Sequence, residues 1–484
     1  MIANPLCRTF SRQGRIGEPL PAQQRAREAA GNNALEYRVY DSFAALQQLK
    51  PAWDDLAGRH GDLFGSYDWC ETWWRHFGRD RRLEIHTLHD GHCLVAVLPL
   101  FRETIRLAGV GLRTVRVVGC DYTISTVGLV IEPAYVERFT RRLLQRLDRD
   151  GSWDVLQIGP LRCYAAVAEP MGRTCAQDPR VQTVVIGRRD NWDTLFHLPD
   201  TYERFEASLP GTDRKTARRR ERQLHERHRV EVSVVTDPEQ VQPAMDILIQ
   251  LHQKRWVDRG QTGQFAGAGD IEAFHREVAQ RLAETGQLVL LTIKADDQFV
   301  AATCSYFFGR RMHNLFVGYC YDPPWQRYGL GRITYGHLIR RAIAHGVRTM
   351  EDGRGIFEHK LHLGGRLYGE QSLLVIRRGW SARLRCWLML RIAYVLHVLG
   401  GRIWMDFLAP RLGITPRFKH SHQRIWALAQ IFRRARFPLL GGPRLLEGRC
   451  VQPAPAEHLG DPADQARATA SDKPTGTEGM TQQE

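Results

Sequence analysis

The chain has 484 residues and a mass of 55.5 kDa, which is enough for two or three ordinary domains. Its composition, 43% hydrophobic and 25% charged, is typical of a globular protein. A net charge of +15 indicates an anionic partner: a phosphorylated cofactor, a nucleic acid or an acidic membrane. The ten cysteines are scattered without any C-x-x-C pair, which argues against a zinc site and a disulfide framework and is typical of reduced thiols in the cytoplasm.

We expect disordered tails at 1–34 and 440–484, because both are rich in Pro, Gly, Gln and Ala and have little apolar periodicity. The first tail has basic residues but no continuous apolar run, so no secretory signal is predicted. Between the tails, short strand-like runs alternate with helical segments. This pattern predicts a mixed α/β (α+β) fold.

The first block, 35–195, begins with a strand and an amphipathic helix and continues with the aromatic helix "SYDWCETWWRHFG". Two apolar runs joined by Asp90-Gly91 predict a β-hairpin. The same alternation of strands and helices continues to about residue 161. We therefore expect one α/β domain here.

The second block, 196–379, repeats that order after the basic helix "TDRKTARRRERQLHERH". Turns are predicted at Asp296-Asp297 and Gly309-Arg310, followed by a glycine-bearing helix and the strand "RTMEDGR". The run "HTLHDGHCLVAVLPL" resembles "LTIKADDQFVAATCSYF", so the two blocks read as two copies of one fold.

The start of the glycine-bearing helix carries the clearest chemical signal. Gln326-Arg327-Tyr328-Gly329-Leu330-Gly331 connects a strand directly to the helix. Backbone N–H groups at a helix start can bind a pyrophosphate, and glycines let its oxygens come close. Arg327 and Arg332 would add charged contacts. The plainer interpretation is an ordinary strand–turn–helix connection.

These residues resemble the GNAT acyltransferase superfamily, whose Gln/Arg-x-x-Gly-x-Gly/Ala pattern is filled by Gln326, Gly329 and Gly331. More narrowly, the chain is similar over 36–380 to the double-domain CelD/BcsL-type acetyltransferases, which are related to the Fem aminoacyltransferases. The motifs "SYDWCETWWRHFG", "LVAVLPLFRE" and "MEDGRGIFEHKLHLGGRLYG" carry this resemblance. It implies tandem GNAT-like domains, the first degenerate and without a glycine loop. Where the family often has Phe-Asp-Phe this chain has Met350-Glu351-Asp352, which leaves open which acid faces the site.

The resemblance implies acyl-CoA as the donor and no metal. The expected donor-binding residues are Phe316, Val317, Gln326, Arg327, Gly329, Leu330, Gly331 and Arg332. The catalytic candidates are Asp352 as a base, Tyr328 as an acid for the leaving thiolate (with Tyr335 and Tyr368 as alternatives) and Lys360 as an anion holder. His359 and His362 have no third ligand nearby, so no metal site is predicted.

The basic helix has eight Arg or Lys between Arg214 and Arg229. Without interleaved aromatic residues it does not predict nucleic-acid binding. An anionic substrate site or a merely solvated helix remain open. We assign Arg218, Arg219, Arg222 and Glu358 to the binding of an anionic sugar or envelope precursor.

Residues 380–439 predict a basic amphipathic extension, apolar on one side and studded with arginine on the other. Its most apolar stretch is interrupted by Arg391 and His397 and is shorter than the roughly 20 residues needed to span a bilayer. It would dock on its own domain, which we favour, or make a peripheral contact with the inner face of the membrane.

Together these observations predict a cytoplasmic acyltransferase. It would move an acyl group, expected to be acetyl, from acyl-CoA to an amine or hydroxyl of a polysaccharide or cell-envelope precursor. The alternatives are a Fem-like transferase that uses aminoacyl-tRNA, and a non-catalytic scaffold in exopolysaccharide synthesis.

Overall fold

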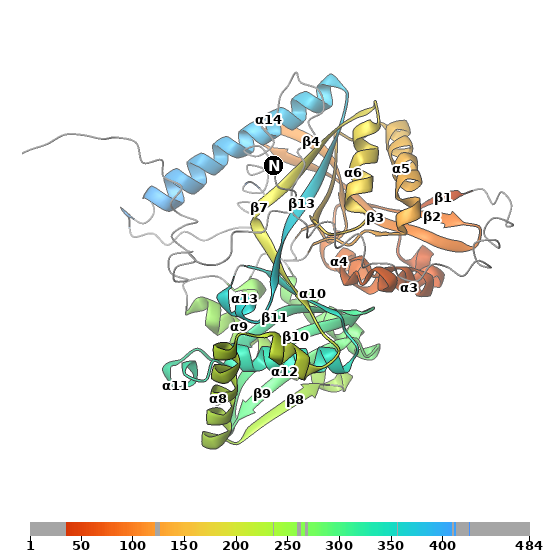
Figure 1. The fold of residues 1–484 in the computed structure, drawn as a ribbon. Coiled ribbons are helices and arrows are strands. Elements are labelled where there is room, and N and C mark those ends of the chain that lie inside the picture. The colour runs from red at the N-terminus through yellow and green to blue at the C-terminus, as the bar shows by residue number, and fades with distance from the viewer. Residues whose placement is uncertain are drawn as a thin grey trace, which may run out of the picture.

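The computed structural model describes residues 35–121, 126–235, 237–258, 263–266, 270–355, 357–408, 411–412 and 425. Both expected tails and most of the 409–439 stretch lie outside these residues. The described chain forms one mixed sheet of 13 strands flanked by helices, which confirms the predicted α/β class (Figure 1). The strand order is β1-β2-β3-β4-β6-β13-β7-β12-β11-β10-β9-β8, with β5 paired to β3.

The first half of the chain builds one end of this sheet. Its elements are β1 (Glu36–Tyr40), α3 (Lys50–His60), α4 (Tyr67–Phe77), β2 (Arg82–Asp90), β3 (Cys93–Leu107), β4 (Val110–Val117), β5 (Val130–Ile131), α5 (Val136–Asp150), β6 (Val155–Arg162), α6 (Ala168–Gln177) and β7 (Val181–His197). The predicted aromatic helix is α4. It begins at the cap Ser66, whose hydroxyl accepts from the Trp69 N–H, and it ends before Gly78.

The second half builds the other end. Its elements are α7 (Tyr202–Ser208), α8 (Gly211–Arg227), β8 (Val230–Val235), α9 (Val241–Val257), α10 (Ile271–Glu284), β9 (Leu288–Ala295), β10 (Gln298–Phe308), β11 (Arg311–Tyr319), α11 (Pro323–Gln326), α12 (Leu330–Ala344), β12 (Thr349–Arg354), α13 (Glu358–His362) and β13 (Arg366–Arg377). After β13 come α14 (Trp380–His397) and a π-helical segment, Val398–Leu408.

The two halves repeat one order of elements: a strand, two helices, three antiparallel strands, a helix, a strand, a short helix and a long strand. Hairpin pairing of β2 with β3 and of β10 with β9 and β11 confirms the turns predicted at Asp90-Gly91, Asp296-Asp297 and Gly309-Arg310. The repeated order agrees with two copies of one fold. The boundary at residue 195 stays a prediction, because β7 continues across it to His197.

The last strand of each half crosses into the other half. β13 lies between β6 and β7; it pairs with β6 from Glu370 to Ile376 and with β7 along its whole length. β7 in turn continues past this region to pair with β12. Figure 1 shows these two long strands side by side, running from one half to the other. The halves are therefore joined by continuous backbone pairing.

Aromatic side chains on the helices join the halves a second time. One core cluster contains buried residues of α3 and α4 from the first half and of α9 and α10 from the second. Trp69 of α4 packs edge-on against Phe274 of α10, with ring centroids 5.1 Å apart. Such contacts add to the stabilisation from buried area.

Among the described cysteines seven are free, and five of these are buried: Cys70, Cys175, Cys304, Cys320 and Cys386. Cys163 is disulfide-bonded, so the expectation of reduced thiols throughout does not hold there.

Candidate functional site

The sheet opens between β11 and β12. These parallel strands pair only from Arg311 to His313, opposite Thr349 to Glu351. Beyond this point β11 stays with β10 and β12 stays with β7. A cleft of about 670 Å³ lies at the opening, lined by α9, β11, α12, β12 and the segment before and within α13.

Asp352 lines this cleft and is 5% exposed. Its carboxylate accepts from the Tyr335 hydroxyl at 2.6 and 2.7 Å and from the Asn314 amide at 2.5 Å. Lys360 Nζ lies 3.2 Å from Asp352 Oδ2 and donates to the main-chain oxygen of Asp352 at 2.6 Å. Four residues from β11, α12, β12 and α13 thus meet in one buried, fully hydrogen-bonded network.

Tyr335 is a proton donor in this network. Burial, with the adjacent Asp352 charge, raises the pKa of Tyr335 well above its ordinary value, so the phenol stays protonated. Lys360 is 5% exposed and forms an ion pair with Asp352. Asp352 therefore acts as an acceptor for three donors, with a proton-donating phenol beside it in the cleft.

Glu351 points to the opposite face of β12, as the alternation of a strand requires. It lies in a second cavity of about 400 Å³ between the halves. Its carboxylate pairs with Arg162 Nη2 at 2.7 Å and Arg311 Nη1 at 3.0 Å, and it accepts from the Tyr164 hydroxyl at 2.8 Å. Although burial opposes it, the charges of Arg162, His313 and Arg311 hold the pKa of Glu351 well below its usual range.

The two cavities meet at the opening of the sheet. Asn314 and Gly353 line both of them. The sequence did not decide between Asp352 and Glu351 as the acid that faces the site. In the structure they line different cavities, on opposite faces of the sheet at this opening. The first half contributes Arg162 and Tyr164 to the second cavity, so this cavity exists only when both halves are present.

The glycine loop begins α12 as predicted. Gly329 is the cap of the helix and has φ +63°, a left-handed conformation that favours glycine. A Cβ at this position would lie 2.8 Å from Arg220 Nη1. At Gly331 a Cβ would lie 3.0 Å from the Tyr319 ring, so part of the need for glycine there is packing within the protein.

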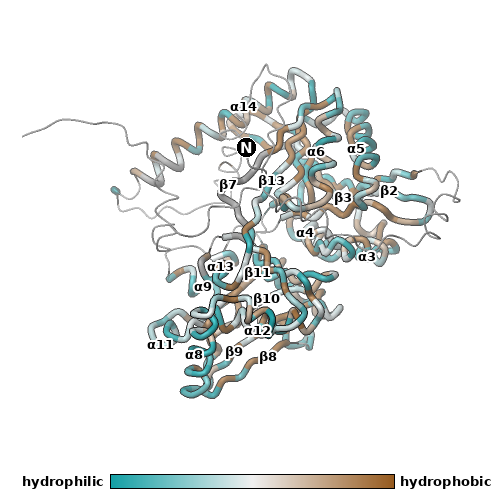
Figure 2. The backbone as a smooth tube through the Cα atoms, viewed as in Figure 1, coloured by the Kyte–Doolittle hydropathy of each residue, from teal (hydrophilic) through white to brown (hydrophobic). Residues whose placement is uncertain are grey.

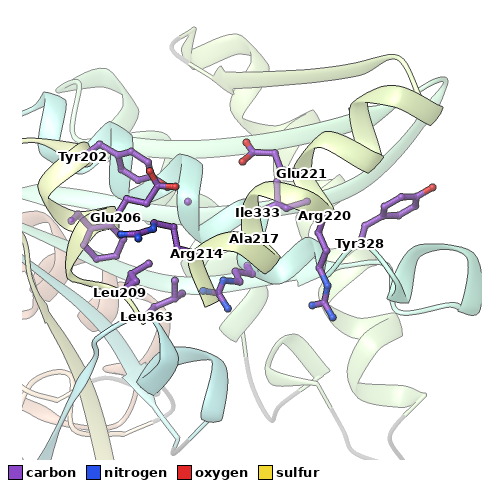
Figure 3. A pocket seen from close by; sticks show the side chains of 13 residues that line it. Tyr202, Glu206, Leu209, Arg214, Ala217, Arg220, Glu221, Tyr328, Ile333 and Leu363 are labelled. Atoms are coloured by element: carbon purple, nitrogen blue, oxygen red, sulfur yellow. The ribbon is translucent and has the colours of Figure 1, made fainter. Parts of the chain in front are cut away.

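The basic helix α8 packs beside α12 and encloses a third pocket of about 500 Å³. Figure 3 shows Tyr202 and Glu206 at one end of this pocket and Arg220 and Tyr328 at the other. Arg214 and Arg332 also line it. Arg332 Nη1 lies 3.3 Å from Asp213 of α8, and this ion pair fixes α8 against the start of α12.

The structure brings together only part of the predicted catalytic set. Asp352 and Lys360 meet in the cleft, whereas Tyr328 lies in the pocket beside α8, where its hydroxyl bonds to His228 Nε2 at 3.1 Å and accepts from Arg327. Tyr335 is the tyrosine that reaches Asp352. Tyr368 lines the cavity between the halves.

The predicted donor-binding residues lie on β11, on α11 and around the start of α12. Val317 lines the cleft and Phe316 is buried beside it, while Leu330 is a core residue of α12. Gln326 and Arg327 are exposed. The side chain of Glu358 lies outside the described part of the chain.

The predicted acceptor-binding arginines lie on the outer side of α8. Arg218 forms a two-pronged ion pair with Glu206 at 2.6 and 2.7 Å, and Arg222 lies near Glu226. Arg219 is exposed. None of the three lines the cleft or the cavity between the halves as the structure describes them.

Two polar residues of the cleft were not predicted from the sequence. Asn314 is 3% exposed and follows His313 in β11; an amide directly before the apolar run Leu315–Val317 is the signal that could have marked it. His252 on α9 is 4% exposed and bonds to the Val317 carbonyl at 3.2 Å. Burial lowers its pKa to about 4, so it stays neutral at pH 7. Its spacing in the helix is that of a core residue, so no pattern set it apart.

No group of three metal-ligating side chains occurs within the described residues. None of the described helices combines the length and apolarity needed to cross a bilayer.

Comparison with known proteins gives a match in the second half. Residues 212–361 match the family model described as "Acetyltransferase (GNAT) domain". The matched segment contains α8, the glycine loop and Asp352. No curated protein matches the chain significantly.

Several solved structures are similar in fold. A crystal structure of FemX is 10% identical and covers 70% of this chain and 96% of its own, with a TM-score of 0.48. A conserved protein of unknown function from Bacteroides thetaiotaomicron is 11% identical, covers 71% and 100%, and has a TM-score of 0.43. A tandem GNAT protein from the clavulanic acid biosynthesis pathway is 14% identical, covers 72% and 99%, and has a TM-score of 0.37.

Proposed function

We propose that the protein transfers an acyl group from acyl-CoA to an amine or hydroxyl of an anionic sugar or cell-envelope precursor. The observation that carries the proposal is the Asp352–Tyr335–Lys360 network at the opening of β11 and β12, within the segment that matches the GNAT family. A deep cleft with a carboxylate and a protonated phenol offers the groups that acyl transfer needs.

The donor would lie along β11 and end at the start of α12. The N–H groups at the beginning of this helix, with Arg327 and Arg332, would hold the pyrophosphate. Arg220 of α8 lies next to Gly329 and would add a further positive charge. The thioester would then reach β11 near Phe316–Gly318, where main-chain N–H groups would stabilise the developing oxyanion.

In the transfer step the acceptor's nitrogen or oxygen forms a bond to the acyl carbon and the carbon–sulfur bond breaks. Asp352 would take the proton of the acceptor, directly or through water, after exchanging one of its present donors. Tyr335 is protonated and lies against Asp352, so it would give its proton to the leaving thiolate and take up the proton that Asp352 received from the acceptor. Lys360 would hold Asp352 in place and keep the cleft electrically balanced.

The acceptor would approach from the cavity between the halves. Asn314 and Gly353 line this cavity and the donor cleft alike, which favours entry of the two substrates from opposite faces of the sheet. Arg162, Tyr164 and Tyr368 would offer donors and aromatic faces to a sugar. The exposed arginines Arg218, Arg219 and Arg222 would attract a polyanionic acceptor to the surface nearby.

Binding and turnover of acetyl-CoA test the proposal. Calorimetry should show binding, and release of free thiol should depend on an added amine-bearing nucleotide sugar. Arg327→Glu should weaken CoA binding about 10- to 100-fold, because a charged hydrogen bond is lost and a repulsion is added. Arg229→Glu is the matched control, since Arg229 is 80% exposed and lies at the start of β8.

Other outcomes would identify a different function. Turnover that requires aminoacyl-tRNA would support the Fem-like alternative, and CoA binding without any turnover would support the scaffold. Wild-type protein that binds no CoA would contradict the assignment of the donor site.

A further inference from the structure

The surface of α14 and the segment after it is unusually apolar. Twelve large hydrophobic side chains are exposed in the described part of the chain, and nine of them lie between Trp380 and Leu412. These nine are Trp380, Leu384, Val395, Leu399, Ile403, Trp404, Phe407, Leu408 and Leu412. Figure 2 shows hydrophobic stretches alternating with hydrophilic ones along α14. Exposed apolar patches of this kind mark interaction sites.

One side of α14 is already used. Cys386, Met389 and Leu390 are buried against strands β4, β6, β7 and β13 in one core cluster. The helix therefore docks, as favoured above, but mainly on the sheet of the first half and not on the second domain. At 100° per residue Leu384 and Val395 lie on the side opposite Cys386, and they are 38% and 50% exposed. The docked side anchors the helix while the apolar outer side stays open.

The same region is basic. Between Trp380 and Leu412 the sequence has five arginines and a single acid, Asp406, which gives a net charge of +4. The next stretch of sequence, 413–446, adds seven Arg or Lys and no acid. Arginine also accompanies the aromatic residues: Arg391 lies 5.8 Å from the Trp387 ring and Arg411 lies 3.6 Å from the Phe407 ring.

We infer that residues 380–412 bind the surface of a lipid bilayer with anionic head groups. Apolar and aromatic side chains would enter the boundary of the acyl chains, and arginines would reach the head groups. The charge argues against a second copy of this chain as the occupant, because two surfaces that each carry +4 would repel each other. The helix would lie in the plane of the interface, since no described helix can cross a bilayer.

Flotation of the full-length protein with vesicles tests this inference. We expect binding to vesicles of phosphatidylcholine with about 30% phosphatidylglycerol, and weak binding to pure phosphatidylcholine. Binding should fall steeply between 0.1 M and 1 M salt, because the Debye length falls from about 10 to about 3 Å. Each basic residue near the surface contributes roughly fivefold to the partition coefficient.

Matched double variants separate this surface from general hydrophobicity. Leu399→Glu with Phe407→Glu should weaken partitioning about 10- to 100-fold, because two apolar side chains no longer leave water. Val257→Glu with Phe299→Glu changes two exposed hydrophobic residues elsewhere, 64% and 38% exposed, and should leave partitioning unchanged. Circular dichroism and thermal unfolding should show both variants folded.

Three results would overturn the inference. The first is absence of flotation by the wild-type protein. This includes the case in which only a variant lacking 447–484 floats, because the apolar surface of 380–412 would then not be free to bind lipid in the full chain. The second is equal partitioning of the two double variants. The third is a wild-type dimer that Leu399→Glu with Phe407→Glu dissociates without any binding to vesicles. Flotation does not require acyl transfer, so the outcome is independent of the proposed reaction.

Discussion

Replacing Asp352 with Asn keeps the shape of the side chain and removes its charge and its ability to accept a proton. The Tyr335 hydroxyl can still donate to the amide oxygen. Lys360, which is 5% exposed, loses the charge that lies 3.2 Å from its ammonium group. The variant therefore removes two roles of Asp352 together: pairing with a buried lysine, which affects stability, and taking a proton in catalysis, which affects kcat.

The magnitudes of the two effects differ. Removing one partner of a buried ion pair costs about 3–5 kcal/mol. Lys360 would keep the main-chain oxygens of residue 352 at 2.6 Å and of Gly353 at 3.5 Å, so we expect about 3 kcal/mol. Loss of a positioned base should lower kcat about 10²- to 10⁴-fold. CoA binding should change little, because the pyrophosphate loop is not altered.

The double variant Asp352→Asn with Lys360→Met serves as the control. It removes both buried charges, so most of the lost stability should return while kcat stays low. Urea unfolding followed by tryptophan fluorescence and steady-state release of thiol measure the two quantities. A single variant that keeps more than about a tenth of the wild-type kcat would show that Asp352 is not the base. A double variant as unstable as the single one would refute the charge argument.

Three further changes test other parts of the structure. Burial lowers the pKa of His252 to about 4, so as the pH falls His252 takes up a proton in the unfolded chain before it does so in the folded protein. The free energy of unfolding should therefore decline from pH 6.5 to 4, and it should decline less steeply in His252→Gln. In Glu351→Gln the buried Arg162 keeps Asp62, 3.4 Å away, as an ion-pair partner. We expect the free energy of unfolding to fall by about 3 kcal/mol at pH 7. Because the folded pKa of Glu351 is depressed, that difference should shrink as the pH falls below about 4.5, which urea titrations at several pH values would show. In Gly318→Ala the new Cβ would lie 2.7 Å from the His252 main-chain nitrogen, so α9 must move off β11; a melting temperature equal to that of the wild type would contradict this contact.

Local patterns predicted the local parts of the fold. Asp90-Gly91, Asp296-Asp297 and Gly309-Arg310 gave hairpins because turn residues interrupt alternating apolar runs. The glycine loop could be placed because a strand, two glycines and a helical pattern follow one another without a gap. Asp352 and Lys360 were found through a family motif, and they lie only eight positions apart in the sequence.

Contacts between distant segments could not be predicted in this way. Asn314 meets Asp352 only because β12 leaves β11 at the opening of the sheet, and nothing local indicates where two strands separate. Tyr328 and Tyr335 both lie close to the glycine loop, and the sequence pattern alone does not rank them. Tyr328 precedes the cap Gly329 and lines the pocket beside α8, whereas Tyr335 lies within α12 and reaches the cleft.

The position of β13 has a consequence for the order of folding during synthesis. The first half completes its sheet only with residues 366–377, which leave the ribosome after nearly all of the second half. Until then β6 presents an unpaired edge, a template for unwanted association. We therefore expect that the first 195 residues do not fold stably on their own. Adding residues 366–377 as a separate peptide should complete the sheet and allow them to fold.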